Sequence, residues 1–131
     1  MNYMKIFLVN IFLITLIGCG GGGGGSANCT PGPDDHCIKY EVSTSTQNVS
    51  ITYIDEDGNT VNLPNENSHN QPWTYTFTAK NGSHLALSAQ LLGSGYDTVY
   101  VIIYVDNQEV AKESSYSVGV SASTEYDIPS N

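Results

Sequence analysis

Two cysteines, Cys29 and Cys37, lie in a short stretch that also carries Asp34, Asp35 and His36. Residues of these types bind metal ions or, in an oxidising compartment, form a disulfide between the two thiols. Zinc ligands usually come in closely spaced pairs with a second pair downstream, and no second pair follows here. A disulfide that closes this segment is therefore the simplest pairing, with a metal site as the alternative.

Other residues that could perform chemistry do not form a recognisable active site. Three carboxylates in the segment 55–59 are similar to a calcium loop, but Gly58 is fourth in the segment where such a loop needs its glycine sixth, so a hairpin turn is favoured. His36, His69 and His84 lie in unlike segments, and no serine or cysteine occurs in the context of a nucleophile elbow. The leading prediction is a protein that is not an enzyme and that has no catalytic residue, metal ion or cofactor.

Tyrosine is abundant, with nine copies, and could provide a binding surface. The aromatic residues of the segment 73–79 alternate with threonines and share one face, which favours a place in the core. Tyr100 and Tyr104 occur in a segment with apolar residues on both faces, so we expect them on an outer face beside Ile102. These three residues are the predicted partner or ligand face, because such amphipathic patches are typical of interfaces.

The elements that position these residues are predicted to be strands. Apolar residues alternate with polar ones and show no helical period, and glycine, asparagine and aspartate punctuate the runs at turns. The pattern predicts an all-β fold, an antiparallel immunoglobulin-like β-sandwich of seven to eight short strands. Both cysteines are expected before the first strand, so apolar packing must hold the sheets together. The clearest strand segments are 38–42, 49–53, 73–79, 85–89 and 98–105, and the expected turns are at 57–58, 81–82, 93–95 and 106–107.

The first 18 residues form a predicted signal peptide, because a short positive start is followed by an apolar run that is too short to span a bilayer. The run ends in Leu16-Ile17-Gly18-Cys19, which resembles the lipobox of bacterial lipoproteins. That resemblance implies that Cys19 becomes the lipidated first residue and anchors the chain to a membrane. Gly20 follows in place of aspartate, which is similar to lipoproteins of the Gram-negative outer membrane. An ordinary cleavage site beside a free thiol is the alternative.

Residues 19–28 are predicted to be a lipidated, glycine-rich tether, and residues 29–131 a β-sandwich domain with an N-terminal disulfide loop. The chain has 131 residues, with 13 acids against four bases and a net charge of −9. This charge excludes nucleic-acid binding, which depends on lysine and arginine contacts to phosphate. It also disfavours contact with anionic headgroups, so we expect a protein partner above the membrane.

The order of the strand segments resembles the soluble domain of the MmpS (mycobacterial membrane protein small) family over residues 38–124. The resemblance is carried by Tyr40-Glu41-Val42, residues 49–53, Asp57-Gly58, Leu63-Pro64, Pro72-Trp73, residues 85–90 and residues 101–106. It implies a small membrane-anchored β-sandwich that acts as an accessory to an RND-type exporter.

Together these patterns lead to two hypotheses about function. The first is a non-enzymatic, lipid-anchored cell-envelope protein that serves as an accessory or adaptor for another envelope component, with an RND-type export system as the partner that the resemblance implies. The alternative is a surface binding module for a glycan or small ligand, with the exposed tyrosines as stacking platforms.

Overall fold

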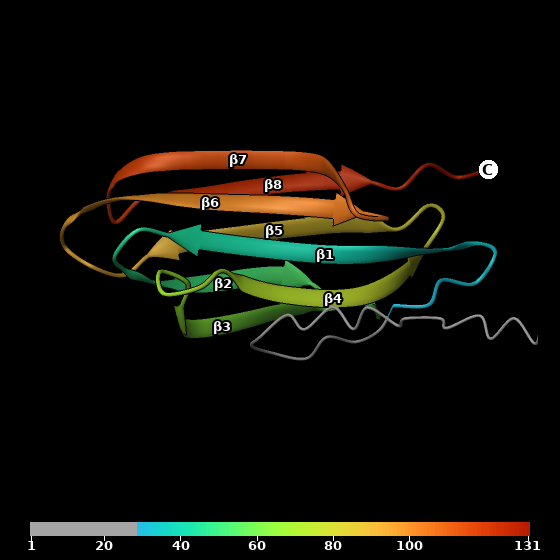
Figure 1. The fold of residues 1–131 in the computed structure, drawn as a ribbon, viewed down its shortest axis with the longest axis horizontal. Helices are drawn as coiled ribbons and strands as arrows, with labels where there is room; N and C mark the ends of the chain where they lie inside the picture. Colours follow the sequence, from blue (N-terminus) through green and yellow to red (C-terminus); the bar gives the residue numbers. More distant parts are fainter. Residues whose placement is uncertain (1–28) are drawn as a thin grey trace, which may run out of the picture.

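The computed structural model describes residues 29–131, which form eight β-strands and no helix (Figure 1). Within these residues, no helix is long and apolar enough to cross a membrane. The predicted signal peptide, the lipidation site Cys19 and the tether 19–28 lie outside the described residues. The strands are β1 (Asp35–Thr44), β2 (Asn48–Ile54), β3 (Thr60–Asn67), β4 (Trp73–Lys80), β5 (His84–Leu91), β6 (Tyr96–Val105), β7 (Gln108–Val118) and β8 (Ser121–Asp127).

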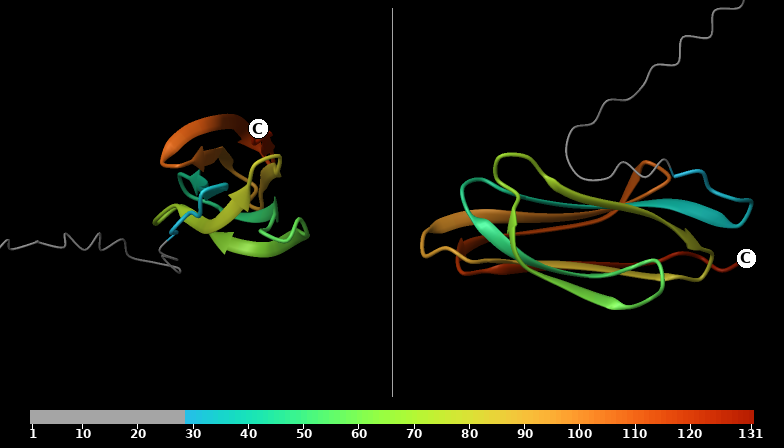
Figure 2. Two further views of the ribbon diagram at one scale, coloured as in Figure 1. Left: turned by 90° about the vertical axis from the view of Figure 1, so that its right-hand side faces the viewer. Right: turned by 90° about the horizontal axis from the view of Figure 1, so that it is seen from below.

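The strands form two antiparallel sheets that face one another as the layers of a sandwich (Figure 1, Figure 2). The strand order is β4-β1-β6-β7 in one sheet and β3-β2-β5-β8 in the other. Only the connections β2–β3 and β6–β7 stay within a sheet, whereas every other connection crosses between the layers. The prediction of an all-β, antiparallel β-sandwich is confirmed, with eight strands at the upper end of the expected number.

The core lies between the two layers and follows from strict alternation along the strands. In β1, for example, Ile38, Tyr40 and Val42 are fully buried between outward-facing neighbours. A group of aromatic side chains fills one part of the core. Tyr40 packs edge-on against both Tyr53 and Phe77, with 5.9 and 5.2 Å between ring centroids. The expectation that the aromatics of segment 73–79 belong to the core is confirmed for Phe77, while Trp73 and Tyr75 are partly buried and pack against the core.

The Cys29–Cys37 disulfide is present, with 5.6 Å between the Cα atoms, as predicted. The expectation that both cysteines precede the first strand is wrong for Cys37, which lies inside β1 because pairing with β4 begins at Asp35. The bond therefore ties the N-terminal segment to β1 on the outside of one sheet. It does not join the two sheets, which are held together by apolar packing.

Three of the four expected turns have the left-handed backbone that their residues favour, at Gly58, Gly82 and the pair Asp106-Asn107. The segment 93–95 differs, because neither of its glycines has a positive φ. At Gly93, a Cβ atom would instead meet the end of the Gln47 side chain, which would have to move.

Candidate binding face

Strand β6 carries large apolar or aromatic side chains on both of its faces. Val99, Val101 and Ile103 are fully buried in the core, so the alternate residues point outward from the sheet. We call the outward-facing set the tyrosine stripe. It consists of Tyr96, Tyr100, Ile102 and Tyr104 on β6, with Tyr116 on the neighbouring β7.

Exposure along the stripe increases toward the end of the sandwich where β6 begins. Tyr104 is half-buried and Tyr100 is 38% exposed, whereas Tyr96 is 71% exposed and Tyr116 is 68% exposed. The rings of Tyr96 and Tyr116 stack with 5.9 Å between centroids and 30° between planes. The register explains the contact, because Tyr116 lies opposite Thr98 and is therefore a diagonal neighbour of Tyr96.

The predicted face of Tyr100, Ile102 and Tyr104 is placed together on one surface, but its middle residue is not free to bind. Ile102 is 8% exposed, because it lies opposite Glu41 on β1 and opposite Lys112 on β7, whose side-chain stems flank it. Tyr100 is exposed, as expected, but the most exposed residues of this surface are Tyr96 and Tyr116, which sequence reasoning missed. Tyr96 could have been found from its spacing, since it shares the alternation of the other two β6 tyrosines.

Lysines cover the inner part of the stripe. Lys39 Nζ lies 4.1 Å from the ring centroid of Tyr104 and 3.4 Å from Glu41 Oε2, and Lys112 Nζ lies 5.7 Å from the ring centroid of Tyr100. These are cation–π contacts that hold two tyrosine rings in place. Burial raises the pKa of the Tyr104 hydroxyl, as does nearby Glu41, so it stays protonated and can donate a hydrogen bond at neutral pH.

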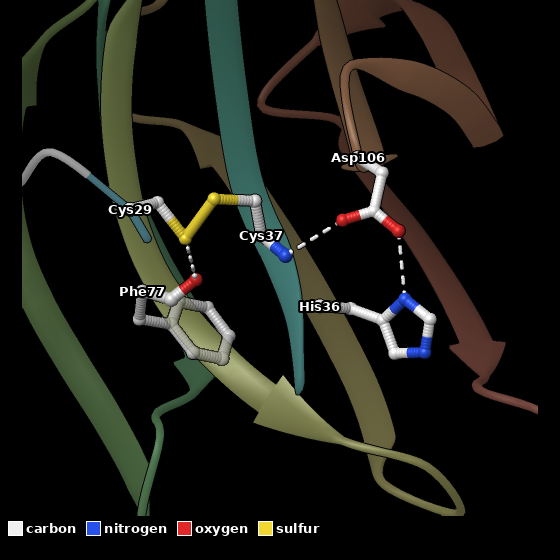
Figure 3. Close-up of a disulfide and its surroundings, with 5 residues drawn as sticks. All are labelled: Cys29, His36, Cys37, Phe77 and Asp106. Atoms are coloured by element: carbon white, nitrogen blue, oxygen red, sulfur yellow. Dashed lines mark hydrogen bonds and ion pairs between the residues drawn. A yellow bond between two sulfur atoms is a disulfide. The ribbon is translucent and has the colours of Figure 1, made fainter. Parts of the chain in front are cut away.

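A second polar cluster lies beside the disulfide (Figure 3). His36 Nδ1 is 2.7 Å from Asp106 Oδ2 and Nε2 is 2.7 Å from Asn81 Oδ1, while the Cys37 N–H donates to Asp106 Oδ1 at 2.9 Å. These hydrogen bonds raise the pKa of His36 above its ordinary value, and the bond to Asp106 has the largest effect. His36 in turn lowers the pKa of Asp106. Because both ring nitrogens face acceptor oxygens, the protonated imidazole fits best and has no lone pair left to act as a base.

Cys29 Sγ lies 3.5 Å from the Phe77 carbonyl oxygen, on the side of the disulfide away from His36 (Figure 3). A disulfide sulfur carries no hydrogen, so this approach is a packing contact and not a donated hydrogen bond. A metal site at the two cysteines was the alternative prediction, but both sulfur atoms are bonded in the disulfide and cannot bind a metal as thiolates. Across residues 29–131, no group of three or more histidine, cysteine, aspartate or glutamate side chains is arranged to hold a metal ion.

The remaining candidates from the sequence are structural. Asp55 Oδ1 accepts the N–H groups of Asp57 and Asn59, which is the hairpin turn that the glycine position favoured. His84 Nδ1 lies 2.6 Å from Asp127 Oδ1 at an exposed position, and His69 lies in the connection between β3 and β4. His36 and His84 lie at the same end of the sandwich, since His36 bonds to Asn81 in the β4–β5 connection, but they bond to different aspartates, Asp106 and Asp127.

In comparisons with known proteins, no protein-family model matches this chain, and no curated protein sequence matches it.

Proposed function

We propose that this chain is a non-enzymatic, lipid-anchored binding protein of the cell envelope that docks onto another envelope component through the tyrosine stripe. The observation that carries the proposal is the stacked pair Tyr96 and Tyr116, which are the most exposed large apolar side chains of the described residues although both lie within strands. Tyrosines are enriched at interfaces, because a rigid ring buries a large area at low entropic cost.

The position of the pair supports a partner away from the lipid surface. Cys29 is bonded to Cys37 near the start of β1, and the start of β1 pairs with the end of β6. Tyr96 begins β6 and Val105 ends it, a separation of about 30 Å along an extended strand. If the chain is anchored through Cys19, its N-terminal attachment and the exposed tyrosines therefore lie at opposite ends of the sandwich.

The class of partner follows from the resemblance to the MmpS family. That resemblance favours an accessory role beside an RND-type exporter, with this chain anchored at the outer membrane of a Gram-negative envelope. A small sandwich with an exposed aromatic surface fits such a role. The β-sandwich itself does not distinguish this partner from others, because the same fold serves many functions.

A glycan or small-ligand binding module remains the second candidate, and the same tyrosines favour it. The exposed rings of Tyr96 and Tyr116, with 30° between their planes, can stack on sugar rings as well as on a protein surface. A glycan array separates the two candidates. Binding that is lost in Tyr116→Ala would support the second, and signals at background for the unaltered protein would remove it.

Photo-crosslinking in intact cells tests the leading proposal. A photoreactive phenylalanine analogue is placed at position 116, and a matched control carries it at position 123 on the outer face of the other sheet. Ser123 is exposed between the inward-facing Ala122 and Thr124, so both positions are accessible. We expect an adduct with an envelope protein from position 116 only. Recovery of uncomplexed protein from both positions, or equal adducts from both, would contradict the proposed surface.

The anchor has a test of its own, which does not depend on the partner. Cys19→Ser should move the protein from the membrane fraction to the soluble envelope fraction, whereas Cys29→Ser should leave it membrane-bound. A membrane-bound Cys19→Ser variant would show that the predicted lipid anchor is wrong.

A further inference from the structure

The two sheets have four edge strands, β4 and β7 in one sheet and β3 and β8 in the other. An unprotected edge exposes backbone N–H and C=O groups that can pair with another strand, and proteins usually block such edges with charges, proline or bulges. Three of these edges are blocked. Strand β3 has Pro64 and a register shift against β2, β7 has three charged residues, and β8 has two.

Strand β4 has none of these protections over most of its length. Residues 73–79 have the sequence Trp-Thr-Tyr-Thr-Phe-Thr-Ala, which contains no charge and no proline, and the pairing of β4 with β1 has no bulge. Aromatic residues and threonine are also the types that favour strands. Among the edge strands of the described chain, β4 is thus the one suited to accept another strand.

The direction of the free backbone groups on β4 follows from hydrogen bonds on β1. The Asp106 N–H donates to the Cys37 carbonyl at 2.8 Å, so Cys37 faces β6 and the next residue, Ile38, faces β4. Ile38 lies opposite Phe77, so the backbone groups of Phe77 bond to β1. Because successive residues face opposite sides of a strand, the backbone N–H and C=O groups of Thr74, Thr76 and Thr78 point away from β1, toward the open edge of the sheet.

The side chains of β4 are arranged almost symmetrically about Thr76. In an antiparallel pair of two β4 strands centred there, Thr76 lies opposite its own copy, Thr74 lies opposite Thr78, and Tyr75 lies opposite Phe77. Threonine pairs and aromatic pairs are both favourable across strands. This register also joins the residues whose free backbone groups point outward, so each N–H finds a carbonyl.

We infer that β4 is the interface with a second copy of this chain, paired antiparallel about a two-fold axis at Thr76. The near-palindromic strand favours a self-pair over a strand of another protein, because an isologous interface needs each residue to match its symmetry mate. Residues 73–79 also carry no charge in a chain of net charge −9, so the paired strands place no like charges opposite one another; the nearest carboxylate, Glu56, accepts a hydrogen bond from the Tyr75 hydroxyl.

The half-buried aromatics beside the edge add apolar area to this interface. Trp73 and Tyr75 stack on one another and contact Tyr53 at tilted angles, yet neither is fully buried, and no strand of the described residues pairs with β4 on its outer side. A single paired edge remains smaller than a standard interface, so association is expected to be weak in dilute solution. Concentration of the chain on a membrane would favour the pair.

Cysteine crosslinking of the full chain in cells tests the interface. In a hydrogen-bonded antiparallel pair, opposite Cα atoms lie about 5.5 Å apart, which suits a disulfide. Thr76→Cys should therefore give a disulfide-linked dimer in an oxidising envelope, whereas Asn62→Cys, exposed in the middle of edge strand β3, should stay monomeric. Mass spectrometry must show the 76–76 bond with Cys29–Cys37 intact. A Thr76→Cys variant that stays monomeric, or equal dimer from both positions, overturns the inference.

Charged substitutions at Thr76, on the two-fold axis, provide a second test that does not depend on added cysteines. Thr76→Glu and Thr76→Lys each place like charges opposite one another, so each should lower the dimer fraction measured by sedimentation at high concentration at least fivefold. Mixing the two variants should restore a heterodimer, and Thr76→Val should leave the dimer fraction unchanged. Circular dichroism must show that all variants are folded. Failure of the mixture to recover would refute the symmetric register even if the single variants dissociate.

Discussion

Asp97 is the buried charge on which the fold should depend most. Its side chain is only 3% exposed, at the start of β6. Oδ2 accepts the N–H groups of Thr46 and Gln47 at 2.9 and 3.0 Å, and Oδ1 accepts those of Ser45 and Thr98 at 3.1 and 2.7 Å. One carboxylate thus holds the connection between β1 and β2 against β6, across about fifty residues of sequence.

Asp97→Asn keeps the shape of the side chain but replaces one acceptor oxygen by an NH₂ group. In the less costly orientation, the NH₂ group faces Ser45 and Thr98, so two N–H donors lose their acceptor. A hydrogen bond to a charged group contributes about 1.5–3 kcal/mol. Because Ser45 is exposed, water recovers part of this loss. We therefore expect the free energy of unfolding to fall by about 3 kcal/mol.

Urea denaturation at neutral pH, followed by far-ultraviolet circular dichroism, measures the change. The matched control is Asp127→Asn, because Asp127 has an 83% exposed side chain bound only to His84 and should change stability by less than about 0.5 kcal/mol. A difference between Asp97→Asn and the unaltered protein of under about 1 kcal/mol would refute the reasoning, because the Thr98 N–H alone should lose more than that when its charged acceptor is removed.

The effect of Asp97 should also depend on pH with a definite sign. Burial raises the pKa of its carboxyl group, but the four N–H donors together outweigh burial and lower the pKa below its ordinary value of 3.8. Among the donors, the N–H of Thr46 has the largest effect. A lowered folded pKa means that the stabilisation is present above the unfolded pKa and is lost as the pH falls through the folded pKa. The stability difference between Asp97→Asn and the unaltered protein should therefore shrink at pH values well below 3.8. A difference that is constant down to the acid transition would contradict this.

Three further changes test other parts of the structure. Replacing both Cys29 and Cys37 by serine should lower the free energy of unfolding by roughly 2–3 kcal/mol, measured in urea, because the unfolded chain regains the entropy that the closed loop removes; an unchanged free energy would contradict this reasoning. His36 has a raised pKa, so its bond to Asp106 should stabilise the fold fully below about pH 6.5 and lose this effect as the pH rises through the folded pKa, which a pH series against His36→Gln would show or refute. Gly58→Ala should cost about 1 kcal/mol by thermal unfolding, because φ is +78° there while no neighbouring atom lies within 4 Å of the added methyl group; a larger loss would point to a contact that the structure does not contain.

The strands and their buried faces could be predicted because each is a local pattern. In β4, the alternation of aromatic residues with threonine specifies a strand and its inner face without knowledge of any neighbour. The turn at Gly58 is likewise local, since glycine favours the left-handed conformation found there. The Cys29–Cys37 bond was predictable because only two cysteines follow the predicted anchor.

What the sequence could not show depends on register between distant strands. Tyr116 joins Tyr96 because β7 pairs with β6 so that Tyr116 falls opposite Thr98, and a shift of one residue would have turned Tyr116 inward. The burial of Ile102 depends in the same way on its neighbours in β1 and β7. Asp97 was missed as well, because its partners lie in a loop that only the folded chain brings near.

The two surfaces proposed here belong to one sheet, and this has a consequence for binding. A two-fold axis through paired β4 strands is perpendicular to the sheet, so the outer faces of both copies lie on the same side. The order β4-β1-β6 then separates the two β6 strands by five strand spacings, about 24 Å, with their stripes running in opposite directions. Two stripes at a fixed distance bind a partner with repeated or two-fold features more tightly than one stripe does. Thr76→Glu should therefore weaken the adduct formed from position 116 although no tyrosine is changed, whereas an undiminished adduct would show that each copy binds independently.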